Sequence, residues 1–273
     1  MSKMFDALRR AEDERRRRLR RMGGQADEPP AVEPAGIPPL DRTAPRPKPA
    51  VVKPIRPAEG ESVIPDDFLR ELGILRNSIE TLMQRKERRT LLFTSSAHEE
   101  GTTTLAASYA RLVALNTGSR VLLIELNART PSLFWRMGMS GGEGVTHYMA
   151  GGRSLEALVQ PAEDAGFDLM HVGERDPAQI QLLLADHFPR LIAEAQQSYD
   201  TVIIDAPPIV GSPETPPMAA SVDGVVLVVQ CERTKREIVQ RSIDLVEQMG
   251  GRTLGVVLNR KKYYIPDFIY KRI

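Results

Sequence analysis

A threonine-rich turn is the stretch of this sequence best suited to chemistry. The turn runs from Thr94 to Gly101 after the apolar run Leu91–Phe93, and Thr102, Thr103 and Thr104 then open a segment with apolar residues at helical spacing. Strand, small-residue turn and helix in this order form the layout of a phosphate-binding loop. The usual loop ends in Gly-Lys-Ser/Thr, whereas Gly101 is followed here by Thr102. The chemistry to be expected therefore depends on how the missing lysine is interpreted.

Asp205 is the second candidate, because it ends the apolar run Thr201–Ile204. A carboxylate at such a strand end is the second element of nucleotide-binding P-loop proteins, where it holds Mg²⁺ directly or through water. A strand-ending aspartate that only caps a turn is the simpler reading. The phosphate-loop layout upstream of Asp205 favours the magnesium role.

The elements that must position these residues alternate between strands and helices. Continuous Val/Ile/Leu runs predict an α/β fold of the P-loop type, with a mostly parallel sheet and helices on both faces. Strands are expected at 91–93, 120–126, 167–174, 201–204, 223–230 and 253–259. Helices are expected at 66–82, after Thr102, and at 154–158, 178–198 and 235–249, with a loop at 138–152. Because sites in such folds lie at the carboxyl ends of the strands, Glu125, Asn127, Asp205 and Asn259 should converge near the turn.

The rest of the chain suggests four parts. Residues 1–24 form a basic N-terminal helix, either a docking helix for an anionic surface or acidic partner or a solvated, charged helix end. Residues 25–65 hold eleven of the 21 prolines and read as an extended linker. A globular domain at 66–260 and a basic aromatic tail at 261–273 follow.

Composition excludes several classes of function. The net charge is +1, and aromatic residues make up 5% of the chain, so nothing points to a nucleic-acid surface. Cys231 is the single cysteine, which rules out an internal disulfide and fits a reducing compartment. No apolar run approaches the roughly 20 residues of a membrane span. We therefore expect a cytoplasmic protein that reaches the inner membrane only through a partner.

Five segments, in order, resemble motifs of the bacterial tyrosine kinase family (BY-kinases of the CpsD/CapB type), which are deviant P-loop ATPases of exopolysaccharide and capsule synthesis. They are SSAHEEGTTTLAASYA, RVLLIELNARTPSL, YDTVIIDAPPIV, VDGVVLVVQ and LGVVLNR. The resemblance implies ATP and Mg²⁺ as cofactors, with Thr103 and Asp205 at the metal. It implies a catalytic group of Asp205, Glu125 and Asn127. The residues it places at the nucleotide are Glu100, Gly101, Thr102, Thr103, Thr104, Asn259 and Arg260.

Three positions depart from the family pattern. Thr102 stands where the family has lysine, Glu99 where it has glycine, and Asn127 where it has an aspartate near Mg²⁺. Asparagine cannot ionise or act as a base. A lysine at ~4 Å from a phosphate contributes about 4 kcal/mol at an effective dielectric constant near 20, and Glu99 adds an opposing charge. The departures all predict weaker nucleotide chemistry.

The tail has two readings. By resemblance, Tyr263, Tyr264 and Tyr270 match a C-terminal tyrosine cluster that BY-kinases phosphorylate between subunits. The apolar residues among them instead favour a tail that packs on a surface or binds a partner.

Three functions are compatible with the sequence. The first is a pseudo-kinase that regulates exopolysaccharide synthesis and export at the cytoplasmic face of a membrane polysaccharide co-polymerase, with weak or no ATP turnover. The second is an active tyrosine autokinase of the same pathway, with self-association. The third is a positioning ATPase similar to MinD and ParA, although the additional early lysine of that group is missing at Ser96 to His98.

Overall fold

The computed structural model defines the globular part of the chain. It describes residues 66–84, 86–127, 133, 137, 139, 142–162, 165–173 and 177–261, without the side chains of 66 and 177–186. The predicted N-terminal helix, the proline-rich linker and the tyrosines of the tail lie outside the described residues. None of the helices in the described ranges has both the length and the apolar character needed to cross a membrane.

A single sheet organises the described residues, with seven strands in the order β3-β4-β2-β5-β1-β6-β7. Their bounds are β1 Arg89–Ser95, β2 Val121–Glu125, β3 Gln160–Ala162, β4 Phe167–Met170, β5 Thr201–Asp205, β6 Gly224–Gln230 and β7 Thr253–Asn259. All neighbouring pairs are parallel except β3 with β4. The predicted α/β fold is confirmed, and β3 is an edge strand that was not predicted.

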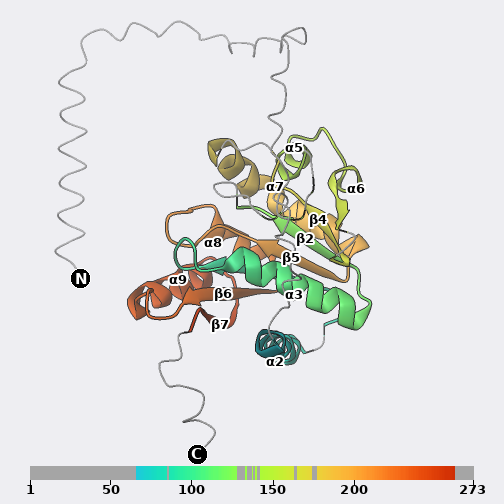
Figure 1. The fold of residues 1–273 in the computed structure, drawn as a ribbon. Helices are drawn as coiled ribbons and strands as arrows, with labels where there is room; N and C mark the ends of the chain where they lie inside the picture. Colours follow the sequence, from blue (N-terminus) through green and yellow to red (C-terminus); the bar gives the residue numbers. More distant parts are fainter. Residues whose placement is uncertain are drawn as a thin grey trace, which may run out of the picture. The chain divides into compact units, whose positions relative to one another are not determined.

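Helices cover both faces of the sheet (Figure 1). The elements are α2 Asp66–Leu82, α3 Thr102–Thr117, α5 Val145–Met149, α6 Leu155–Leu158, α7 Pro177–Ser198, α8 Thr215–Met218, the 3-10 turn η1 Ala219–Ser221 and α9 Arg236–Gln248. One core lies between the sheet and α2 with α3, and the other between the sheet and α5, α7, α8 and α9. The continuous apolar strands follow from this double coverage, because both of their faces are buried.

Strand register brings the polar residues to one edge. Phe93 of β1 lies opposite Asp205 of β5, and Glu125 of β2 lies opposite the same Asp205. On its other side, β1 pairs with β6 up to Ser95 opposite Val228. The carboxyl ends of four strands therefore lie close together, namely those of β2, β5, β1 and β6. Ligands of parallel sheets of this type bind at this edge.

The expected loop at 138–152 is partly wrong, because Val145–Met149 forms helix α5. Tertiary contacts hold this short helix: Val145 N–H donates to the carbonyl of His171 at 2.9 Å, and Thr146 N–H donates to that of Val172 at 3.1 Å. Gly144 allows the close approach, since a Cβ there would lie 1.9 Å from the His171 carbonyl oxygen. A five-residue helix fixed by contacts with distant residues has too little pattern of its own to be predicted.

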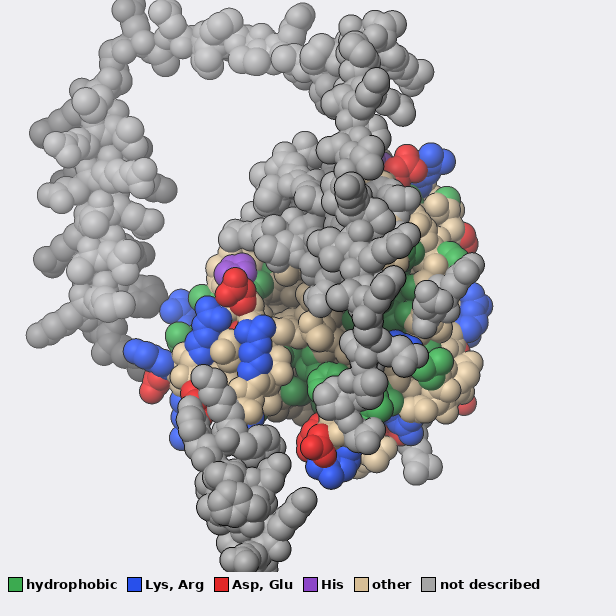
Figure 2. Space-filling model, viewed as in Figure 1, with side chains coloured by type: hydrophobic (Ala, Val, Ile, Leu, Met, Phe, Trp, Pro, Cys, Tyr) green, Lys and Arg blue, Asp and Glu red, His purple; other side chains and the backbone are tan. Residues whose placement is uncertain are grey.

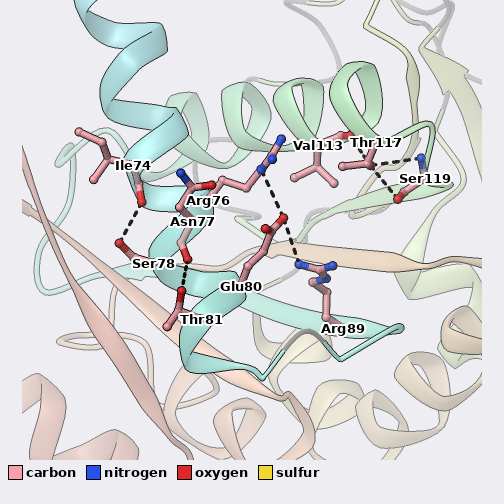
Figure 3. A network of polar contacts seen from close by, with 10 residues as sticks. All are labelled: Ile74, Arg76, Asn77, Ser78, Glu80, Thr81, Arg89, Val113, Thr117 and Ser119. Carbon is pink, nitrogen blue, oxygen red and sulfur yellow. Dashed lines mark hydrogen bonds and ion pairs between the residues drawn. The ribbon is translucent and has the colours of Figure 1, made fainter.

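A charged network ties α2 to the start of the sheet (Figure 3). Oε1 of Glu80 in α2 forms ion pairs with two arginines: it lies 3.2 Å from Nε of Arg76 and 3.8 Å from NH1 of Arg89, the first residue of β1. The side chains of Arg76, Glu80 and Arg89 are 25%, 28% and 17% exposed, so water screens these pairs less than surface ones. The network ties α2 to the start of β1, and α2 and α3 share the hydrophobic core on one face of the sheet.

Candidate nucleotide-binding site

The turn after β1 has the backbone shape of a phosphate loop. Glu99 and Gly101 both adopt left-handed conformations, with φ of 64° and 93°. Helix α3 starts at Thr102, with Gly101 as its N-cap and no side-chain hydrogen bond to the cap. The first N–H groups of a helix have no partner within the helix, and they form a site for anions. The amides at the start of α3 therefore face the space in which a phosphate would lie.

The carboxylate of Glu100 braces this loop from within. Glu100 is 1% exposed, and its Oε2 accepts the N–H of Ala97 at 2.8 Å. Its Oε1 accepts the N–H of Gln230 at 3.0 Å and the hydroxyl of Thr234. Gln230 ends β6, and Thr234 lies in the turn before α9. Glu100 is predicted to lie at the nucleotide, and in the structure its side chain fixes the loop to the end of a neighbouring strand.

Asn259, at the end of β7, holds the same loop with its side chain, which binds a backbone carbonyl of the loop. Its side-chain amide donates to the carbonyl of Glu100 at 2.8 Å, and its Oδ1 accepts the N–H of Arg260 at 2.8 Å. A Cβ at Gly101 would lie 2.2 Å from Asn259 Nδ2, so this approach requires glycine. The two predicted residues Asn259 and Gly101 therefore do come together, in a contact that shapes the loop.

Asp205 is a fully buried carboxylate that lies near the hydroxyl of Thr103. Burial raises the pKa of Asp205 to about 7, the nearby Thr103 hydroxyl lowers it, and the Glu125 carboxylate raises it. A buried acid of this kind is stabilised either by a proton or by a cation.

Glu125 and Asn127 lie on the adjoining strand end, as predicted. Glu125 is fully buried, and its Oε1 accepts the N–H of Leu133 at 2.9 Å. The Oδ1 of Asn127 is buried and has no hydrogen-bond partner among the residues that the structure describes. Glu125 thus orients the segment that follows β2, and Asn127 presents a polar oxygen beside the buried acids without adding charge.

The substitutions at 99 and 102 have different consequences. The Glu99 side chain is 78% exposed and lies 3.6 Å from NH1 of Arg233, so its charge is partly balanced and screened by solvent. It opposes a bound phosphate less than the sequence suggested. Thr102 is buried at the first position of α3 and brings no cation. Thr103 is half-buried and Thr104 is exposed on the same helical turn.

The residues present suit Mg²⁺ and a phosphate. Asp205 offers two buried carboxylate oxygens, and the hydroxyl of Thr103 lies close enough to lower the pKa of Asp205. Carboxylate and hydroxyl oxygens are ligands that Mg²⁺ accepts, usually with several waters and phosphate oxygens. The uncapped amides at the start of α3 lie next to this pair. These groups fit a magnesium–phosphate site in which water and phosphate oxygens fill the other positions of the metal.

Sequence reasoning missed three residues that contact the loop: Gln230, which ends β6, and Arg233 and Thr234 in the turn that follows. Gln230 and Thr234 hold Glu100, and Arg233 pairs with Glu99. Their position was the available signal, because the turn follows a predicted strand at the edge where the loop lies. Their sequence separation from the loop hid the contact.

Comparison with known proteins identifies relatives of this chain. No protein-family model matches it. The chain is 30% identical over 187 residues to the tyrosine-protein kinase CpsD of Streptococcus agalactiae, covering 67% of this chain and 81% of that protein. It is 28% identical over 188 residues to the tyrosine-protein kinase YwqD of Bacillus subtilis, covering 69% and 79%.

A solved structure shows the same fold. The kinase domain of VpsO superposes with a TM-score of 0.63 at 30% sequence identity, over 72% of this chain and 98% of that domain. The phosphate loop, the buried aspartate and the parallel sheet described above thus occur in a chain that shares its sequence pattern with named kinases.

Proposed function

Because this chain belongs to the bacterial tyrosine-protein kinase family, we propose that it is a kinase-like regulator of exopolysaccharide or capsule synthesis and export. In this proposal it binds Mg²⁺-ATP weakly and turns it over slowly or not at all. One observation carries the proposal: the loop is fully braced by Glu100, while position 102 carries no positive charge. The shape for binding is present, whereas the cation that the family places at position 102 is replaced by a neutral threonine.

Weak binding is supported by the groups that remain. The first amides of α3 would meet phosphate oxygens, and Asp205 with Thr103 would hold Mg²⁺. Bound Mg²⁺ would neutralise phosphate charge there. Glu99 is exposed and paired, so it does not close the loop to an anion.

Slow turnover is supported by what the site lacks. Transfer of a phosphoryl group relies on positive charge around the transferring oxygens and on a residue that accepts the hydroxyl proton. Thr102 does not supply the charge, and the amide of Asn127 cannot take a proton. Removing a single preorganised charge-stabilising group of this kind lowers kcat by about 10²–10³.

The regulatory role rests on the family relationship and on the site. A chain that senses nucleotide without fast turnover can report assembly state to a partner, and we propose the cytoplasmic face of a membrane polysaccharide co-polymerase as that partner. The basic segment 1–24 and the aromatic tail 261–273 are the parts that we assign to docking. Location at the inner membrane would then follow from the partner.

Calorimetry with Mg²⁺-ATP tests the proposal on the full chain, Thr102→Lys and Asp205→Asn. We expect weak binding by the unaltered chain, tighter binding by Thr102→Lys, and no magnesium-dependent binding by Asp205→Asn. Intact-mass spectrometry after incubation, with and without the co-polymerase, measures phosphate on the chain. Rapid phosphorylation that Tyr263→Phe, Tyr264→Phe and Tyr270→Phe together abolish would overturn the proposal and establish an active autokinase.

A further inference from the structure

Two arginines beside the phosphate loop share one neutral acceptor. NH1 of Arg233 donates to Oε1 of Gln230 at 3.3 Å, and NH1 of Arg260 donates to the same oxygen at 3.2 Å. Arg260 forms no ion pair within the part of the chain that the structure describes, and Arg233 pairs only with the exposed Glu99. Two guanidinium groups held on one amide oxygen repel each other, so an anion between them would be favoured.

Both arginines extend from positions that are bonded to the loop. Gln230, their shared acceptor, donates its N–H to Glu100, and Thr234, next to Arg233, donates its hydroxyl there. Asn259, next to Arg260, holds the carbonyl of Glu100. Glu100 immediately precedes Gly101 and the start of α3. The arginines are therefore fixed at the rim of the phosphate loop rather than elsewhere on the surface.

The surface around these residues is basic. Figure 2 shows Lys and Arg side chains gathered over the edge formed by β6, β7 and α9, next to an acidic side chain. Arg233 is 53% exposed on its side chain, and Arg260 is also exposed. Arg260 adopts a left-handed backbone, with φ of 56°, fixed by its N–H bond to Asn259 Oδ1. A non-glycine residue in this conformation is uncommon, and functional sites are where such strain gathers.

We propose that Arg233 and Arg260 form an anion-binding pair for the phosphates of a nucleoside triphosphate, and that for binding, though not for transfer, they supply the positive charge that Thr102 lacks. The inference rests on the proposed function, because it concerns the same loop. Guanidinium forks match phosphate oxygens with two parallel N–H bonds, which a single lysine cannot do. The charge enters from the rim of the loop instead of from the start of α3.

Glu99 competes with the phosphate for Arg233 in this arrangement. Its carboxylate lies 3.6 Å from NH1 of Arg233, and both side chains are more than half exposed. A solvent-screened pair of this kind exchanges readily for a ligand with more charge. Neutralising Glu99 should therefore release Arg233 and strengthen phosphate binding.

The test measures binding of Mg²⁺-ATP and of inorganic tripolyphosphate to the full chain by calorimetry. Arg233→Gln with Arg260→Gln should weaken both ligands by about tenfold or more, and Glu99→Gln should tighten both about two- to fivefold. Arg241→Gln, an exposed arginine of α9, makes the same change of charge away from the loop and should alter affinity less than about twofold. Circular dichroism and thermal melting show that each variant is folded.

Each of the other possible outcomes would overturn a specific part of the proposal. Unchanged affinity in the double variant overturns the arginine pair, and loss of ATP without loss of tripolyphosphate overturns its assignment to phosphate. If only Thr102→Lys binds ATP, the arginines do not replace the lysine, whereas the loop of the proposed function stands. If neither the unaltered chain nor Thr102→Lys binds, both the pair and the nucleotide part of the proposed function fail.

Discussion

Glu125 and Asp205 lie directly opposite each other on the parallel strands β2 and β5, and both are fully buried. Burial raises the pKa of Asp205 to about 7, with the Thr103 hydroxyl opposing the shift and the charge of Glu125 adding to it. Two acids so close cannot both carry charge at low cost unless a cation lies with them. The protonation of Asp205 in the metal-free chain therefore depends on pH near neutrality.

Replacing Asp205 by asparagine should stabilise the metal-free chain at high pH. In the unfolded chain this group loses its proton near 3.8, and in the folded chain near 7. The stability that the bound proton contributes is present below the lower value and is lost as pH rises through the upper one. The loss accumulates between the two pKa values, so we expect the stability advantage of Asp205→Asn over the unaltered chain to grow by about 1–3 kcal/mol between about pH 5 and about pH 8.

Urea unfolding with a chelator present measures this difference. Exposed Asp244→Asn is the control and should change stability by less than about 0.5 kcal/mol at either pH. The same gain for Asp205→Asn at both pH values would contradict the raised pKa. In the unaltered chain, added Mg²⁺ should raise the melting temperature more at the higher pH, and in Asp205→Asn it should not.

Neighbouring glutamates 99 and 100 should respond in opposite ways to loss of charge. Glu100→Gln replaces one acceptor oxygen by an N–H₂ group that faces donors from Ala97, or from Gln230 and Thr234. We expect it to destabilise the chain by about 2–4 kcal/mol and to speed hydrogen exchange at the amides of Ala97 and Gln230. Glu99→Gln removes only an exposed ion pair and should change stability by less than about 0.5 kcal/mol. Equal effects of the two substitutions would mean that Glu100 does not brace the loop.

Substitutions at two glycines with left-handed backbones, Gly101 and Gly118, should distinguish the cost of backbone strain from the cost of a steric clash. Gly101→Ala places a Cβ 2.2 Å from Asn259 Nδ2, whereas Gly118→Ala meets nothing within 4 Å. Gly118→Ala should therefore lose only about 1–2 kcal/mol, the cost of the left-handed backbone. Gly101→Ala should lose about 2–4 kcal/mol, because it also displaces the Asn259 bond to Glu100. Chemical denaturation compares the two, and similar losses would exclude a role for the Asn259 contact.

The α2 network should matter more than surface ion pairs on the same helix. Glu80→Gln leaves Arg76 and Arg89 half-buried without their carboxylate (Figure 3), and we expect a loss of about 1–3 kcal/mol. Asp67→Asn breaks the exposed pair with Arg70, whose side chain is 68% exposed, and should change stability by less than about 0.5 kcal/mol. Thermal melting at low and high salt is the measurement. An effect of Glu80→Gln that vanishes in salt would show that the network is solvated.

Much of the fold could be predicted because the buried strands have a clear sequence pattern. Continuous apolar runs that end in a polar residue, such as Thr201–Asp205 and Thr253–Asn259, indicate buried parallel strands with a site at their ends. Strand β3 could not be predicted, because it has three residues, contains Pro161, and is defined only by its pairing with β4. Helix α5 was hidden for the same reason: its backbone bonds go to residues 171 and 172.

The residues of the site also differ in whether local sequence is enough to predict their role. Asp205, Glu125 and Gly101 could be placed from their own neighbours in sequence. The role of Glu100 could not, because its partners Gln230 and Thr234 lie 130 and 134 positions away. Sequence indicated which residues gather at the sheet edge, but not which of them hold the loop and which face a ligand.

The brace around Glu100 has a consequence for how such a chain can change over generations. Ala97, Gln230, Thr234 and Asn259 make the bonds that shape the loop, and Thr102 makes none of them in the described part of the chain. The shape of the loop and its positive charge therefore depend on different residues. During evolution the lysine at position 102 can be lost without unfolding the protein. A single substitution can then restore the lysine in a loop that has kept its conformation.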